Sequence, residues 1–211
     1  MLLLVGLGNP GKDYSSNRHN IGSMAVDGII HAYGLGTTQK RIRPPGLFVD
    51  GFVDRTKVKI LKPLTYMNES GNAVGRTIRY WRLEPNKIFI FHDDIDLAPG
   101  KVRTKFGGGH AGHNGVRNIE SHVGKNFWRV RIGVGHPGEK KRVKKHVLNN
   151  FAKSDQKWVK ETLTAISTAL PILLNGDDSA FMTKIALLQQ STEEKHQRPK
   201  EHKFTVLQKD K

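Results

Sequence analysis

The chain has 211 residues, no cysteine, and 35 lysines and arginines against 19 aspartates and glutamates, a formal net charge of +16. The absence of cysteine excludes disulfides, thiol nucleophiles and cysteine-ligated metal sites, and no apolar run is long enough to cross a membrane. The positive charge favours a polyanionic partner, most often nucleic acid. The amino terminus lacks a basic n-region and a small-residue cleavage site, so we expect a cytoplasmic protein without a signal peptide.

Apolar runs and alternating stretches predict the strands of a central sheet. In chain order, the expected strands cover residues 2–5, 47–53, 58–61, 88–91, 101–105 and 129–134. Apolar residues at helical spacing predict the helices, over residues 21–33, 70–81, 116–123 and 155–175. Ser70 is a candidate helix cap, and Pro171 is expected to kink or end the last helix.

The alternation of strands and helices predicts a single-domain α/β/α sandwich with a mixed, mainly parallel twisted central sheet. Residues 34–46 read as a loop. The domain is expected to span residues 1–188. Past Leu188 the composition turns polar and charged, which predicts a basic, disordered tail over residues 189–211.

Polar side chains follow two apolar strands directly. The loop after residues 2–5 carries His19, and residues 88–91 are followed by Asp93. In open α/β sheets, ligands bind at the carboxyl ends of the strands. A histidine held by a carboxylate is a good base near neutral pH, because the carboxylate fixes the tautomer and stabilises the imidazolium. We therefore expect His19 and Asp93 to act as such a pair if the fold brings them together.

Carboxamides stand at three similar junctions, Asn9, Asn68 and Asn114. They cannot titrate, but they can orient a water molecule and donate hydrogen bonds to a developing oxyanion. Each also has an ordinary structural explanation as a turn or helix-entry residue.

Other chemistries fit the sequence less well. Gly6-x-Gly8-x-x-Gly11 matches a dinucleotide-binding fingerprint, but Pro10 removes an amide and the helical periodicity begins only at Ile21. The G-x-S-x-G elbow of serine hydrolases is absent, and the glycine-rich loop at Gly107 lacks the ending of a P-loop.

A metal site is a further alternative. Residues 92–96 read His-Asp-Asp-Ile-Asp and could ligate a divalent ion with His110, His113 or His136. Their spacing matches no standard ligand set, so we expect neither a metal nor a cofactor.

Two strands carry cationic stripes. Alternation places Lys101, Arg103 and Lys105 on one face of the first, and Arg129 and Arg131 on one face of the second. Edge strands often carry charge simply to avoid aggregation. The stripes fit that role or contact with phosphates equally well.

Six segments together resemble the bacterial-type peptidyl-tRNA hydrolase family, in its order and spacing from residue 1 to about 185. They are VGLGNPG at 5–11, RHN at 18–20, PLTYMN at 63–68, HDDIDLAPG at 92–100, GGGHAGHNG at 107–115 and RIGVGHPG at 131–138. Six matches in register are far more specific than any one of them.

The resemblance implies an enzyme that needs no metal or cofactor and cleaves the ester between a peptide and the 3′-terminal ribose of tRNA. This reaction recycles tRNA from peptidyl-tRNA dropped by stalled ribosomes. The resemblance makes His19 the catalytic base, Asp93 its support and Asn9 the residue that distinguishes blocked from free aminoacyl-tRNA. It also implies positions that contact the tRNA 3′ end, the peptide or the acceptor stem: Tyr14, Tyr66, Met67, Asn68, Asn114, Lys105 and Arg131, to which we add Arg103 from the same stripe.

Two residues depart from the family pattern. Tyr66 stands where the family usually has phenylalanine, and Ser23 where it usually has an aromatic residue. The alternative function is a non-catalytic RNA- or tRNA-binding protein on the same fold. The enzyme, for which we expect a monomer, is favoured by the intact set of His19, Asp93, Asn9, Asn68 and Asn114, since pure binding would not need it.

Overall fold

The computed structural model describes residues 1–197, and the side chains of residues 1–192. Within that range a seven-stranded sheet has the order β2-β3-β4-β1-β5-β7-β6. Its strands are β1 (Leu2–Gly6), β2 (Gln39–Arg41), β3 (Gly46–Val53), β4 (Thr56–Pro63), β5 (Ile88–Asp94), β6 (Val102–Phe106) and β7 (Trp128–Gly133). The α-helices are α1 (Ile21–Ala32), α2 (Ser70–Trp81), α3 (Asn114–Val123), α4 (Val143–Leu148), α5 (Gln156–Leu174) and α6 (Asp178–Gln197).

The four central strands β4, β1, β5 and β7 are parallel, while β3 and β6 run antiparallel to their neighbours. This arrangement confirms the mixed, mainly parallel sheet expected from the sequence. Strand β2 pairs antiparallel with β3 and lies in the segment 34–46, so the expectation of a continuous loop there is wrong. A three-residue polar strand has no apolar alternation by which a sequence pattern could reveal it.

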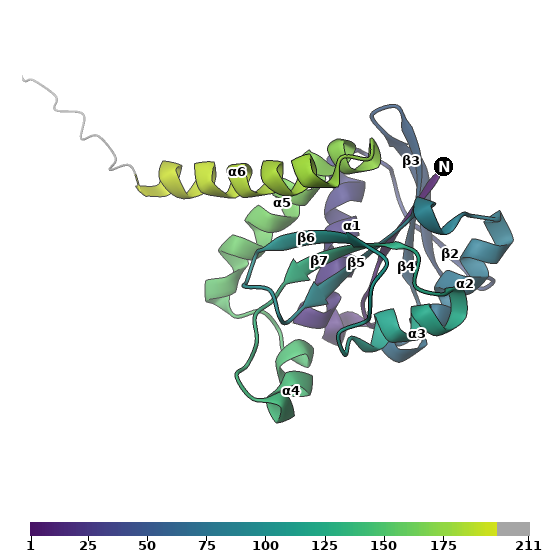
Figure 1. Ribbon diagram of the computed structural model, residues 1–211, viewed down its shortest axis with the longest axis horizontal. Helices are drawn as coiled ribbons and strands as arrows, with labels where there is room; N and C mark the ends of the chain where they lie inside the picture. Colours follow the sequence, from purple (N-terminus) through teal and green to yellow (C-terminus); the bar gives the residue numbers. More distant parts are fainter. Residues whose placement is uncertain (198–211) are drawn as a thin grey trace, which may run out of the picture.

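The helices pack around the central sheet (Figure 1), held against it by two separate clusters of buried hydrophobic residues. Helices α1, α5 and α6 share one core with Leu4, Phe89 and Phe91, all of which are buried. Helices α2 and α3 share the other with Leu3 and Ile90. Because successive strand residues point to opposite faces, strands covered on both faces must be apolar throughout, as the runs at 2–5 and 88–91 are.

Helix α5 continues past Pro171 to Leu174 instead of ending there. Proline has no N–H, so the carbonyl of Ser167, four residues earlier, loses its normal helical partner. The hydroxyl of Tyr33 donates to that carbonyl at 3.0 Å and replaces the missing bond. The helix therefore tolerates a proline near its end.

The carboxyl-terminal tail does not begin at residue 189, because α6 runs on to Gln197. Phe181 and Ile185 are buried against the core shared with α5, and the Gln189 side chain donates to the Gly100 carbonyl at 2.9 Å. Residues 189–197 are polar, but several are good helix formers and extend an anchored helix. The remaining part of the expected tail, residues 198–211, lies outside the described residues.

Among the described helices, none has the length and apolar character that crossing a membrane requires.

Gly22 and Gly28 of α1 provide a matched test of how closely this helix packs on the sheet. A Cβ at Gly22 would overlap the carbonyl group of Phe91 in β5, whereas a Cβ at Gly28 would lie at ordinary contact distance, 3.4 Å from the Ser167 hydroxyl and 3.9 Å from the Leu163 carbonyl oxygen. We expect Gly22→Ala to lower the free energy of unfolding by about 1–3 kcal/mol through overpacking. Gly28→Ala should be neutral or stabilising by up to about 1 kcal/mol, since glycine weakens helix interiors. Urea denaturation measures both, and equal stabilities for the two variants would contradict this packing.

Candidate active site

A cleft of about 820 Å³ lies at the carboxyl ends of the parallel strands. The loop after β1 leads to a short 3-10 turn, Arg18–Asn20, which presents His19 directly before α1. Asp93 lies near the end of β5, and a second 3-10 turn, Met67–Glu69, follows β4. The edge of the sheet thus brings together residues far apart in the sequence. The residues that line the cleft include Asn9, His19, Tyr66, Met67, Asn68, Asp93, His113 and Asn114, together with residues of α4.

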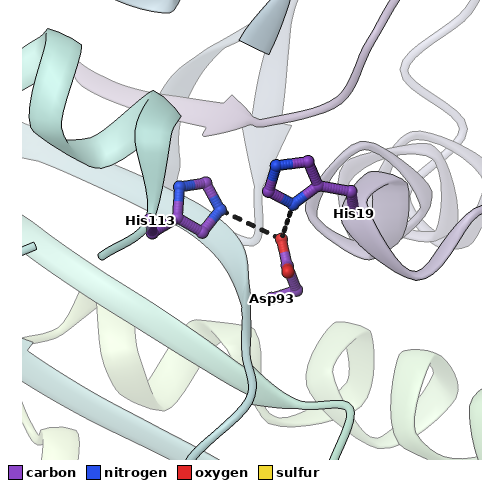
Figure 2. A group of neighbouring side chains, drawn as sticks. All are labelled: His19, Asp93 and His113. Carbon is purple, nitrogen blue, oxygen red and sulfur yellow. Dashed lines mark hydrogen bonds and ion pairs between the residues drawn. The ribbon is translucent and has the colours of Figure 1, made fainter. Parts of the chain in front are cut away.

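The Asp93 carboxylate lies between two imidazole rings (Figure 2). Its Oδ1 is 2.8 Å from His19 Nδ1 and 3.0 Å from His113 Nε2. The side chain of Asp93 is 2% exposed, so its charge depends on these two partners. The expected pairing of His19 with Asp93 is therefore present, with His113 as a second partner.

The hydrogen bonds fix the position of the protons on both rings. His113 Nδ1 accepts from the backbone N–H groups of Gly115 and Val116 at 3.1 and 3.2 Å, so its proton is on Nε2, which donates to Asp93. An ionised carboxylate only accepts, so His19 must likewise donate its Nδ1 proton. Nε2 of His19 then keeps its lone pair and is the free basic nitrogen.

Opposing effects set the pKa values of this pair. Burial alone lowers the pKa of His19, but the charge of Asp93 and the hydrogen bond to it outweigh burial and raise the pKa above its ordinary 6.5. Burial raises the pKa of Asp93, but the charges of His19 and His113 and their hydrogen bonds outweigh this and lower it well below its usual range. Asp93 stays ionised and His19 titrates, which is the division of roles that a carboxylate-supported base needs.

His92 is a second, uncharged histidine beside the pair. Burial, and next the charge of His113, lower its pKa to about 3. Its Nδ1 proton is donated to the Asp93 carbonyl at 2.8 Å, and its ring packs edge-on against His113 at 4.8 Å between centroids. His92 therefore supports the His113 ring and cannot serve as the titrating base.

Two carboxamide side chains that line the cleft each have an oxygen that accepts a hydrogen bond. Asn9 Oδ1 accepts from the Met67 N–H at 2.8 Å, and Asn114 Oδ1 accepts from Arg117 Nη2 at 2.8 Å. Among the described residues, neither NH₂ group has a hydrogen-bond partner, so both remain available as donors. Ser70 does not cap α2, because its hydroxyl donates backwards to the Met67 carbonyl at 2.8 Å.

The remaining candidates occupy the rim or lie outside the cleft. Tyr66 is 56% exposed, and Asn68 is also exposed at the rim. Met67 is buried beneath them, 4% exposed. Tyr14 lies in the 3-10 turn Lys12–Tyr14 and is not among the residues that line the cleft.

The cationic stripes are only partly exposed. Arg103 and Lys105 point outward from the edge strand β6, and Arg131 pairs with Asp94, a residue of the cleft, at 2.6 Å. Arg129, by contrast, is 2% exposed and forms an ion pair with Glu120 at 2.8 Å. The expectation that Arg129 adds to a surface stripe is wrong, because its guanidinium is used inside the protein.

The donor atoms of His19, Asp93 and His113 lie within 4.8 Å of one another, close enough to hold a metal ion. An ion there would have to displace the protons that join each ring to Asp93. The remaining candidate metal ligands, which include His92, Asp96 and His136, do not form such a group within the described residues.

His113 is the functional candidate that the sequence did not reveal in this role. The sequence marked it only as an alternative metal ligand and suggested its neighbour Asn114 as the cap of α3. Here the His113 side chain caps α3 and also bonds Asp93. The sequence signal for this role is a histidine that follows a glycine-rich loop and stands directly before a helix. Its contact with Asp93 depends on the tertiary fold.

The chain is similar to one family over nearly its whole length. The family described as peptidyl-tRNA hydrolase matches residues 3–196. The peptidyl-tRNA hydrolase of Acidiphilium cryptum is 52% identical over 193 residues, which cover 91% of this chain and 100% of that protein. That of Parvibaculum lavamentivorans is 49% identical over 202 residues, which cover 95% and 98%. The crystal structure of peptidyl-tRNA hydrolase from Acinetobacter baumannii has a TM-score of 0.83 at 38% identity and covers 88% of this chain and 94% of that one.

Titration of the histidine rings by nuclear magnetic resonance tests the electrostatics of this site directly. We expect the His19 midpoint to lie above 6.5 and to fall in Asp93→Asn, since burial remains when the opposing charge is removed. His92 should remain neutral between pH 5 and 8 in both proteins. Asp96→Asn, at a nearby exposed carboxylate, is the control and should leave the His19 midpoint unchanged. A His19 midpoint insensitive to Asp93→Asn would contradict the pairing.

Proposed function

Because this chain belongs to the peptidyl-tRNA hydrolase family, we propose that His19 and Asp93 supply the base for its ester hydrolysis. Family membership makes the protein an enzyme that hydrolyses peptidyl-tRNA. The observation that supports the two roles best is the 2.8 Å bond between His19 Nδ1 and Asp93 Oδ1, which leaves Nε2 as the basic nitrogen of a cleft residue.

In the proposed reaction, His19 Nε2 takes a proton from a water molecule as the water oxygen attacks the ester carbonyl carbon. Asp93 stays ionised and stabilises the imidazolium that forms. The tetrahedral intermediate then breaks its bond to the ribose oxygen, which leaves with the proton from His19. The products are a peptide with a free carboxyl group and a tRNA with a free terminal hydroxyl.

The amide donors fit the charge that develops on the substrate. In the proposal, Asn68 and Asn114 orient the water and donate to the oxyanion. The free NH₂ group of Asn9 can donate to the carbonyl oxygen of an N-blocked amino acid but would face the N–H groups of an unblocked ammonium unfavourably. Asn9 would thereby favour peptidyl over aminoacyl esters, while Tyr14, Tyr66 and Met67 contact the 3′ end or the peptide.

We further propose that Arg103, Lys105 and Arg131 bind phosphates of the acceptor stem while the 3′ end enters the cleft. The exposure of the β6 side chains and the short distance from Arg131 to the cleft residue Asp94 support this. The enzyme would act as a cytoplasmic monomer and recycle tRNA released by stalled ribosomes. The alternative of a binding protein without catalysis does not fit a family whose members are named hydrolases.

Loss of the base should nearly abolish turnover. We expect His19→Ala to reduce kcat about 100-fold or more on N-blocked aminoacyl-tRNA, the usual contribution of a general base. The control is His31→Ala, at an exposed histidine of α1, which should keep wild-type kcat. The assay follows release of free tRNA with blocked and unblocked substrates, with and without a metal chelator. Near-normal turnover by His19→Ala would refute the role, and cleavage that stops with the chelator would favour a metal at the histidine–aspartate group.

Loss of a phosphate contact should weaken binding more than chemistry. We expect Lys105→Ala to raise KM with little change in kcat and to reduce the slope of log KM against log salt by about one. Lys57→Ala, an exposed lysine of β4 near the other edge of the sheet, is the control. An unchanged KM for Lys105→Ala at low salt would count against the proposed phosphate contact.

A further inference from the structure

The loop that carries His19 is hydrogen-bonded to a segment more than a hundred residues later in the sequence. The Arg18 N–H donates to the Asn149 carbonyl at 3.1 Å, and the Phe151 N–H donates to the Ser16 carbonyl at 3.0 Å. Between them the Asn17 amide donates to Asn150 Oδ1 at 2.6 Å. Residues 16–18 and 149–151 therefore form a short antiparallel contact directly before the catalytic histidine.

The side chain of Arg18 adds three interactions to this contact. Its guanidinium donates to Asp155 Oδ2 at 2.8 Å and to the Asn150 carbonyl at 2.9 Å, and lies 5.3 Å from the centre of the Phe151 ring. The side chain is only 15% exposed. A lysine could keep the charge but could not reproduce the planar fork and the ring contact together.

Asp155 is a well-held partner for this arginine. It also accepts from the Ala152 N–H at 3.0 Å and from Trp158 Nε1 at 3.2 Å, at the start of α5. Burial opposes ionisation, but these bonds and the charge of Arg18 lower the pKa of Asp155 below its usual value. The ion pair thus joins the His19 loop to the amino terminus of α5.

Residues 149–151 directly follow α4, and α4 forms one wall of the cleft. The cleft lining includes four residues of this helix, Val143, Lys144, Val147 and Leu148. Helix α4 stands apart from the two main helical layers (Figure 1), and its His146 Nε2 donates to the Val134 carbonyl at 3.2 Å. The position of this wall relative to His19 therefore depends strongly on residues 16–18.

We propose that Arg18 is a positioning residue that holds the α4 wall at a fixed distance from His19 and so sets how tightly the cleft binds the substrate. The inference rests on the proposed function of the cleft. Arg18 acts here through Asn150, Phe151 and Asp155, not on the reacting atoms and not through the charge of His19. Its own charge is balanced by Asp155.

The experiment compares Arg18→Gln, Arg18→Lys, Asp155→Asn and the double variant Arg18→Gln/Asp155→Asn. The control is Lys87→Gln, which removes an exposed ion pair to Glu84 at the start of β5, away from the cleft. We expect Arg18→Gln and Asp155→Asn each to raise KM for N-blocked aminoacyl-tRNA about tenfold, with kcat changed less than about threefold. The double variant should resemble either single one, because both break the same contact. Arg18→Lys should rescue KM only in part.

Hydrogen exchange provides a readout that does not depend on catalysis. In Arg18→Gln the amides of residues 146–151 should exchange faster than in the wild type, while those of β1 and β5 exchange at wild-type rates. The acid limb of the pH profile should stay unchanged, since Asp93 is untouched. This combination separates a loosened wall from a general loss of stability, which would affect the core amides as well.

Three results would overturn the proposal. Unchanged exchange in residues 146–151 would show that Arg18 does not hold the wall, and a fall in kcat at constant KM would place Arg18 in the chemical step. A raised KM in Arg18→Gln that is absent in Asp155→Asn would indicate direct contact of Arg18 with the substrate. If the wild type itself proved inactive, the proposed function would fail. The same variants would then be tested by the Kd for blocked aminoacyl-tRNA, which the inference also requires to rise.

Discussion

The carboxylate of Asp93 is enclosed by protein and would be costly to keep ionised without partners, by several kcal/mol for an isolated buried charge. Two histidines provide those partners on the same oxygen, at 2.8 and 3.0 Å. One of them, His113, is itself fixed by the first backbone amides of α3. Hydrogen bonds to this one charge join the turn before α1 and the start of α3 to the end of β5. They fix the part of the cleft that carries His19 and His113.

Much of the fold could be predicted because it rests on local patterns. The apolar runs at residues 2–5 and 88–91 and the helical spacing in α1, α2 and α5 identify a parallel α/β sheet with its polar residues at the carboxyl ends. The short strand β2 and the polar end of α6 have no such pattern. The first is defined by pairing with β3, and the second by the burial of Phe181 and Ile185 one to two turns earlier. Both depend on contacts that a sequence window does not contain.

The candidate site shows the same division. The sequence predicts the pairing of His19 with Asp93, since both follow apolar strands and the chemistry of a histidine–carboxylate pair is general. The second bond of Asp93 to His113 and the internal ion pair of Arg129 with Glu120 are tertiary facts. Alternation along β7 correctly separates Arg129 and Arg131 from the apolar residues. It cannot tell that one guanidinium is buried beneath the glycine-rich loop and that the other lies beside the cleft.

We infer that Asp93 makes His19 the titrating base of ester hydrolysis. The most direct measurement is the pH dependence of kcat/KM on N-blocked aminoacyl-tRNA for the wild type and Asp93→Asn, compared with the ring titration of His19 in each. The base must be neutral, so activity should fall as the pH decreases through the pKa of His19, which lies above 6.5 in the wild type. If Asp93 sets the pKa of the base, the kinetic and ring midpoints agree and shift downward together in Asp93→Asn. A kinetic midpoint that stays in place while the His19 ring midpoint moves would contradict it.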